Sequence, residues 1–190
     1  MNRQTAQFNP DIYQNLFESG KQLLAEKHMD KLLDMALNMA MKISGGDRGW
    51  ICLFKESAQD IEFQVMLNLQ KSETEAASFK FSKLIIENVI TGGIPVFLPD
   101  PAHPSSREVA ADRAHARLYS LICIPLKTGK HPFGILYLDQ KHASEPFTQE
   151  IFELVQEYAK FISTAIHALK EQEQLRSLIS GFGKPVENGD

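Results

Sequence analysis

Hydrophobic residues at helical spacing open the chain. In a segment expected to be helical over residues 10–27, apolar side chains three and four positions apart form a narrow stripe. Asn9 is the expected cap of this helix and Pro10 its first residue, where the missing N–H costs no hydrogen bond. A wider apolar face follows over residues 31–44, with Asp30 as the expected cap. The pattern predicts two consecutive helices.

The spacing then becomes that of extended chain. Trp50–Phe54 is a continuous apolar run, as expected for a strand covered on both faces, and Ile61–Asn68 alternates like a half-buried strand. Pro95–Pro99 is a short apolar run whose prolines suit a sheet edge. Leu121–Leu126 and Phe133–Leu138 flank a turn and predict a hairpin. The pattern therefore predicts five strands, joined without a parallel crossover.

Two further helices are expected among and after these strands. Ser82 is the expected cap of a helix over residues 83–90. Thr148 precedes a long helix whose apolar residues keep helical spacing to Leu169, and a thinner stripe continues to Ile179. Narrow stripes at both ends of a chain are what a parallel helical dimer requires, so we expect a homodimer through helices 10–27 and 148–179.

These elements predict an α+β fold. Its centre is an antiparallel sheet of five or six strands, and the apolar face of the last long helix must pack on one face of it. Odd and even positions of the strands are both apolar, so both faces of the sheet must be covered. Residues 79–118 are the only segment left to cover the second face. A cover of loops and one short helix packs less completely than a helix pair, which predicts a ligand pocket there.

Composition excludes several functional classes. The 190 residues are 43% hydrophobic and carry a net charge of −4 without a dense basic run, so we expect neither a nucleic acid nor a membrane as partner. The apolar runs are far shorter than the ~20 residues of a membrane span. The first residues lack the apolar core of a signal peptide, so we expect a cytoplasmic protein.

The residues that most often carry chemistry are sparse. Cys52 and Cys123 lie in separate apolar runs and form no CxxC pair, so we expect reduced, buried thiols. The six histidines show no HxxxH or HExxH spacing, so we expect no metal site. A mixed site of His103 and His115 with a neighbouring aspartate stays as an alternative. No triad, paired carboxylates or phosphate loop suggests catalysis, so we expect no enzyme.

Several short motifs together resemble the GAF domain, a relative of the PAS fold. They are Asp47-Arg48-Gly49, Gly93-Ile94-Pro95-Val96, Pro99-Asp100, Ser120 to Leu126, Gly134 to Asp139, and Phe147-Thr148. The resemblance implies terminal helices on one face of the sheet and a pocket beneath the irregular segment on the other. It is closest to GAF modules that precede output domains in bacterial signalling proteins. We therefore divide the chain into an N-terminal helical extension (1–29), a GAF domain (30–170) and a C-terminal helical linker and tail (171–190).

The resemblance does not extend to the signatures of three specialised GAF classes. Of the Asn-Lys, Phe, Asp-Glu signature of cyclic-nucleotide binders, Lys141 and Phe147 are present, but Gln140 replaces the asparagine and Ile151-Phe152 the acidic pair. This argues against cyclic-nucleotide binding. Cys123-Ile124-Pro125 stands where phytochromes have Asp-Ile-Pro. Free-methionine-sulfoxide reductases need more reactive cysteines than the two present here.

The expected ligand-binding residues lie in or beside the segment that covers the second face. They are Phe97, Asp100, Arg107, Arg113, His115, Arg117, Tyr119, Ser120 and Cys123. Aromatic rings with cationic donors suit a carboxylate, a phosphate or a purine, although the arginines of such a segment also pair with local acids. The sequence predicts a small-molecule sensor with an unspecified ligand or cofactor. A ligand-free dimerisation module and a methionine-sulfoxide-reductase-like enzyme stay as alternatives.

Overall fold

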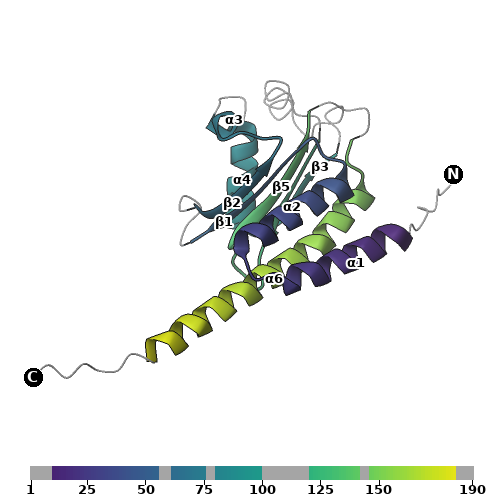
Figure 1. Cartoon of the computed structure of the whole chain (residues 1–190). Helices are drawn as coiled ribbons and strands as arrows, with labels where there is room; N and C mark the ends of the chain where they lie inside the picture. The colour runs from purple at the N-terminus through teal and green to yellow at the C-terminus, as the bar shows by residue number, and fades with distance from the viewer. Residues whose placement is uncertain (1–9, 56–60, 76–79, 100–119, 142–145, 183–190) are drawn as a thin grey trace, which may run out of the picture.

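One antiparallel sheet lies between two layers of helices (Figure 1). The computed structural model describes residues 10–55, 61–75, 80–99, 120–141 and 146–182. The five strands are β1 (Arg48–Phe54), β2 (Ile61–Leu67), β3 (Val96–Leu98), β4 (Ser120–Leu126) and β5 (Gly134–Gln140). Their order is β2-β1-β5-β4-β3, and each neighbouring pair is antiparallel. The expected α+β fold and the hairpin of β4 and β5 are confirmed.

Three helices cover one face of this sheet, which we call the terminal-helix face. They are α1 (Pro10–Ala25), α2 (Met29–Ser44) and α6 (Gln149–Phe182). The apolar side chains of α2 and α6 pack on inward residues of the strands, such as Ile51 in β1 and Leu136 in β5, and α1 packs on α2 and α6. A hydrogen bond of 2.9 Å between the hydroxyls of Ser19 and Tyr158 joins α1 to α6. The first part of α6 therefore belongs to the core, and its last turns extend beyond the sheet (Figure 1).

The opposite face, which we call the α4 face, lies under α3 (Lys71–Glu75) and α4 (Lys80–Gly92). Strand alternation gives it its own set of side chains, because every second residue of a strand points to the same side. Ile85, Ile86 and Val89 of α4 pack into this set. It includes Cys52, Phe54, Leu121, Cys123, Ile135 and Tyr137. Two separate cores on one sheet explain why β1, β4 and β5 are apolar at almost every position.

The helix boundaries confirm some expected caps and correct others. Thr148 caps α6, because its Oγ1 accepts the backbone N–H of Ile151 at 3.2 Å. The expectation for Asp30 is wrong: α2 begins one residue earlier, at Met29, and places Asp30 inside its first turn. The N-cap is His28, whose side chain makes no capping hydrogen bond.

The expectation that Ser82 caps α4 is also wrong. The helix begins at Lys80, and the Ser82 side chain forms a hydrogen bond to a strand residue of the α4 face instead. The helix ends at a glycine: Gly93 has a φ of 63° and donates its N–H to the Val89 carbonyl at 2.9 Å. In the part of the chain that the structure describes, no helix is apolar enough over a sufficient length to cross a bilayer.

Candidate functional site

A buried ion pair lies on the α4 face, at the end of the sheet where β1 begins and β5 finishes. The antiparallel register sets Arg48 opposite Asp139, although 91 positions separate them in sequence. Arg48 Nε donates to Asp139 Oδ1 at 2.7 Å, and Arg48 Nη2 donates to Oδ2. Asp139 is fully buried and Arg48 is 6% exposed. This bidentate geometry is the strongest form of the arginine–carboxylate interaction.

The pair continues into a chain of hydroxyl groups that reaches α4. The Tyr137 hydroxyl donates to Asp139 Oδ2 at 2.5 Å. It has one proton, so in its 2.8 Å contact with Ser82 the serine hydroxyl is the donor. The sequence of donors therefore runs from Ser82 on α4 to Tyr137 and Asp139 on β5, where Arg48 of β1 also donates. We call these four residues the buried polar chain.

The surroundings of Tyr137 and Arg48 set the protonation states of these two residues. Burial raises the pKa of Tyr137 well above its usual value, and the neighbouring Asp139 carboxylate adds to this. Burial opposes the charge of Arg48, but the hydrogen bonds and the charge of Asp139 outweigh it and raise the pKa of Arg48. At neutral pH the tyrosine is therefore neutral and the arginine charged, so the donor directions are set.

Two partly exposed residues, Glu73 and Lys141, lie beside the buried ion pair and add one charge of each sign. Glu73 of α3 lies 3.7 Å from Arg48 Nη1 and 3.2 Å from Lys141 Nζ. The backbone N–H of Gln70, and then the Lys141 ammonium, lower the pKa of Glu73. Two cations and two carboxylates thus face one another across the described part of the site. They compensate each other, so these four groups carry no surplus charge for an anion.

Of the nine expected ligand-binding residues, the structure describes three and places them on different faces. Cys123 is fully buried on the α4 face. Phe97 packs on the terminal-helix face, where its ring stacks on Phe152 of α6 with centroids 4.9 Å apart. Ser120 accepts the backbone N–H of Phe147 at 3.2 Å and donates to Gln140 Oε1 at 2.9 Å. Phe97 and Ser120 are therefore not brought together with Cys123.

The other six expected residues lie outside the described part of the chain. They are Asp100, Arg107, Arg113, His115, Arg117 and Tyr119. His103 and the alternative metal site lie there too. Among the residues that the structure does describe, no three His, Cys, Asp or Glu side chains are close enough to share a metal ion.

The two cysteines are buried, as expected, and are poor nucleophiles. Burial raises the pKa of Cys52 to about 12, and burial raises the pKa of Cys123 as well. Both are therefore thiols at neutral pH, whereas redox and acyl-transfer cysteines react as thiolates. This argues against the reductase-like alternative.

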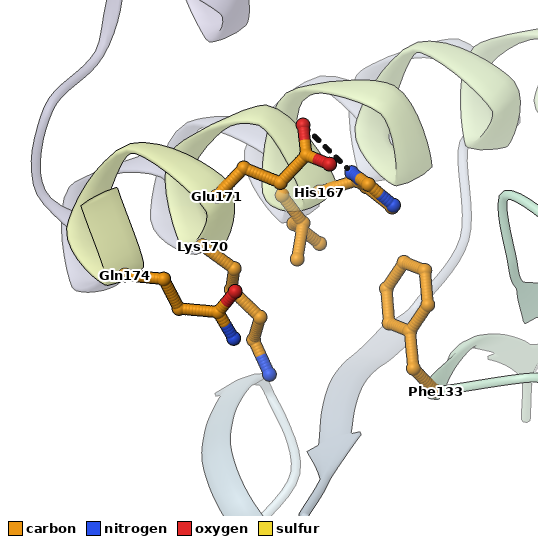
Figure 2. A pocket seen from close by; sticks show the side chains of 6 residues that line it. Phe133, His167, Lys170, Glu171 and Gln174 are labelled. Atoms are coloured by element: carbon orange, nitrogen blue, oxygen red, sulfur yellow. Dashed lines mark ion pairs between the residues drawn. The ribbon is translucent and has the colours of Figure 1, made fainter. Parts of the chain in front are cut away.

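Hollows lined by described residues occur on the terminal-helix face. The larger, of about 280 Å³, lies where α6 leaves the sheet. Figure 2 shows Phe133 facing Lys170 and Gln174 across it, with an ion pair of 3.5 Å between His167 Nδ1 and Glu171 above. A second, of about 170 Å³, lies between the end of β4 and α6. The described part of the α4 face is packed by the apolar side chains of α4.

The comparisons with known proteins agree with this geometry. Residues 28–166 match the family model of the GAF domain. The chain belongs to the GAF domain family. No curated protein matches it in sequence. GAF domains are typically sensory modules of signalling proteins, which is the functional class that this match supports.

Solved structures share the GAF fold at low identity. The GAF domain of a phosphoenolpyruvate-protein phosphotransferase from Coxiella burnetii is 16% identical, with a TM-score of 0.64, over 87% of this chain and 98% of that one. A domain of a putative sensor histidine kinase from Sinorhizobium meliloti is 16% identical, with a TM-score of 0.57, over 80% and 99%. These likenesses show the fold alone.

A phytochrome structure is also similar. The chromophore-binding domain of the bacteriophytochrome RpBphP3 from R. palustris is 12% identical, with a TM-score of 0.61, over 90% of this chain. This chain spans 65% of that domain and 40% of a longer RpBphP3 structure. The activity of such longer proteins is therefore not carried over to this GAF domain.

Sequence reasoning missed the buried polar chain. Arg48 and Asp139 both stand in the motifs that resemble GAF domains, but neither is an unusual residue in its own segment. The pairing depends on the register between β1 and β5, which are far apart in sequence. The signal available in the sequence is one charged residue at an end of each of two apolar strands: Arg48 at the start of β1 and Asp139 near the end of β5.

Proposed function

We propose that this GAF domain is a non-enzymatic, cytoplasmic sensory module. It takes up a small molecule on the α4 face, beneath residues 100–119, and reports occupancy through a homodimer formed by α1 and α6. Of the expected ligand-binding residues, Cys123 belongs to the floor of this site. The cover supplies Asp100, Arg107, Arg113, His115, Arg117 and Tyr119. Phe97 and Ser120 are left out, because they point to the terminal-helix face.

The observation that carries this proposal is the buried polar chain. A buried ion pair contributes little net stability compared with an apolar pair of the same volume, so packing alone does not account for it. The hydrogen bond between Ser82 and Tyr137 joins the sheet to α4, the helix that covers it. A ligand with its own donors and acceptors exchanges hydrogen bonds with this link and so favours a different position of α4.

The test is a ligand screen by chemical denaturation of the full chain. The panel contains nucleotides, amino acids and carboxylates. A ligand at 100 times its dissociation constant raises the free energy of unfolding by about 2.7 kcal/mol. Tyr137→Phe removes the hydroxyl of the buried polar chain and keeps the ring, so we expect it to weaken this stabilisation.

Tyr158→Phe is the matched control. It removes a hydroxyl that is bonded to Ser19 on the terminal-helix face, so the stabilisation by ligand stays as in the original chain. If no panel member stabilises the protein, the ligand-free dimerisation module replaces the sensor as the better account.

A further inference from the structure

One residue contacts the helical layers on both faces of the sheet. Lys127 directly follows β4. Its Nζ donates to the carbonyl oxygen of Gly93 at 2.6 Å, and its backbone N–H donates to Ser163 Oγ at 3.1 Å. The Ser163 hydroxyl in turn donates to the carbonyl of Ala159, one turn earlier in α6, at 2.8 Å. Both ends of Lys127 are therefore fixed, one near α4 and the other on α6.

The α4 end of this contact is the cap of the helix. Gly93 is buried, has left-handed backbone geometry and donates its N–H to Val89, which ends α4. The carbonyls at the end of a helix carry partial negative charge, so an ammonium group is favourable there. Lys127 thus holds the turn that fixes where α4 stops.

The α6 end lies beside a hollow. Ser163 is 3% exposed, yet it lines the 170 Å³ hollow between the end of β4 and α6, together with Pro125, Gln156 and Ala159. Side chains do not fill the space there, so dispersion contacts across it are lost. Beside this hollow, the hydrogen bonds of Lys127 and Ser163 add to the apolar packing of β4 on α6.

We propose that Lys127 couples α4 to α6: a displacement of the α4 C-terminus is transmitted through Lys127 to Ser163 and so to the helix that leaves the domain. This inference concerns the free protein and holds whether or not the α4 face binds a ligand. Lys127 is a positioning residue, and its loss is expected to uncouple the two helices while each stays folded.

The test is hydrogen–deuterium exchange of the full chain, read in three peptides covering α4 and β3, α6 around Ser163, and α2. Gly93→Ala strains the α4 cap, because its φ of 63° disfavours a side chain. We expect exchange to rise severalfold in the α4 and α6 peptides, with α2 unchanged. In the Lys127→Met background, Gly93→Ala still raises exchange in α4, but the response of α6 is lost.

Two further variants serve as a second test of the path and as its control. Ser163→Ala cuts the same path from the α6 side and is expected to abolish the α6 response as Lys127→Met does, so it replaces that variant if the latter does not fold. Lys130→Met changes a lysine in the same turn that is not part of this path, and must keep the response. The proposal is overturned if Gly93→Ala alone does not raise exchange in α6, or if it raises exchange in α2 equally. It is also overturned if the rise in α6 persists in both the Lys127→Met and the Ser163→Ala backgrounds.

Discussion

At the scale of single residues, the buried ion pair of Arg48 and Asp139 is the feature whose disruption is expected to cost a large free energy of unfolding. Arg48 and Asp139 are both almost inaccessible to water, and each satisfies the other. Removing one partner leaves the other charged and buried. We therefore expect Asp139→Asn to lower the free energy of unfolding by about 3–5 kcal/mol, measured by urea denaturation.

An exposed ion pair provides the control. Lys160 and Glu157 form a pair on α6 whose side chains are 65% and 60% exposed. Glu157→Gln is expected to cost less than about 1 kcal/mol, because such pairs are solvated. A similar loss in the two variants would contradict the assignment of Asp139 to a buried site.

A glycine pair in the β4–β5 hairpin gives a steric prediction. A Cβ on Gly134 would lie 2.6 Å from the Cys52 carbonyl oxygen in the neighbouring strand, so the backbone has to shift. We expect Gly134→Ala to destabilise the fold by about 1–3 kcal/mol in thermal denaturation. Gly129→Ala meets no atom within 4 Å and is expected to change stability by no more than about 0.5 kcal/mol. The reverse ranking would mean that the register of β1 and β5 differs from the one described.

A buried tyrosine on α6 predicts alkaline sensitivity. Burial raises the pKa of Tyr158 to about 12, although its hydrogen bond with Ser19 acts in the opposite direction and lowers the pKa. The folded state therefore holds this proton between pH 10 and 12 while the unfolded chain releases it, so stability falls as pH rises through this range. One such group contributes a slope of about 1.4 kcal/mol per pH unit. Denaturation from pH 9 to 11.5 should show a shallower decline for Tyr158→Phe, and an unchanged slope would refute the buried phenol.

At the scale of elements, α6 is a helix of two parts. Its 34 residues begin on the sheet, where Tyr158 and Ile162 are fully buried. Its last turns leave the domain and expose Leu175, Leu178 and Ile179, which are 59%, 59% and 73% accessible. Phe17 and Leu24, seven residues apart on α1, are also exposed. Apolar stripes of this kind fit a second copy of the same helices.

The homodimer is tested by changing the protruding stripe. Leu175→Glu combined with Leu178→Glu places charge in the proposed seam, so we expect sedimentation at tens of micromolar protein to show a monomer with unchanged helix content. Leu84→Glu changes a leucine on α4 that is 47% exposed and should leave a dimer. A monomeric original chain, or equal dissociation in the Leu84 variant, would count against this seam.

Also at the scale of elements, the sequence predicted each strand that the structure describes and the major helices, because each has either a regular apolar period or a continuous apolar run. The short α3 was not expected, since its five residues are all polar and carry no periodic apolar signal. The caps were less predictable: Ser82 has the right chemistry for an N-cap but finds a buried partner, Tyr137, across the fold. Thr148 was predicted correctly because its partner is local, three residues along α6.

At the scale of the whole molecule, the candidate site depends on contacts that cross the chain. Sequence reasoning placed Cys123 on the α4 face, but it assigned Phe97 to the same pocket. The parity of β3 instead turns that ring onto Phe152 of α6. The buried polar chain escaped prediction for the same reason, since it joins three elements through strand register. Local patterns fix which faces are apolar, whereas the partners on each face follow from topology.

Also at the scale of the whole molecule, the proposed function requires that occupancy of one face of the sheet is reported on the other. The α4 face is the proposed ligand site, the sheet lies in the middle, and α6, the helix that leaves the domain, is on the far side (Figure 1). Native mass spectrometry of the full chain with the ligand panel tests binding and assembly together. The account predicts a dimer that carries one panel molecule per protomer, with Tyr137→Phe retaining the dimer and binding less of the molecule. A bare monomer in the presence of the whole panel would contradict it.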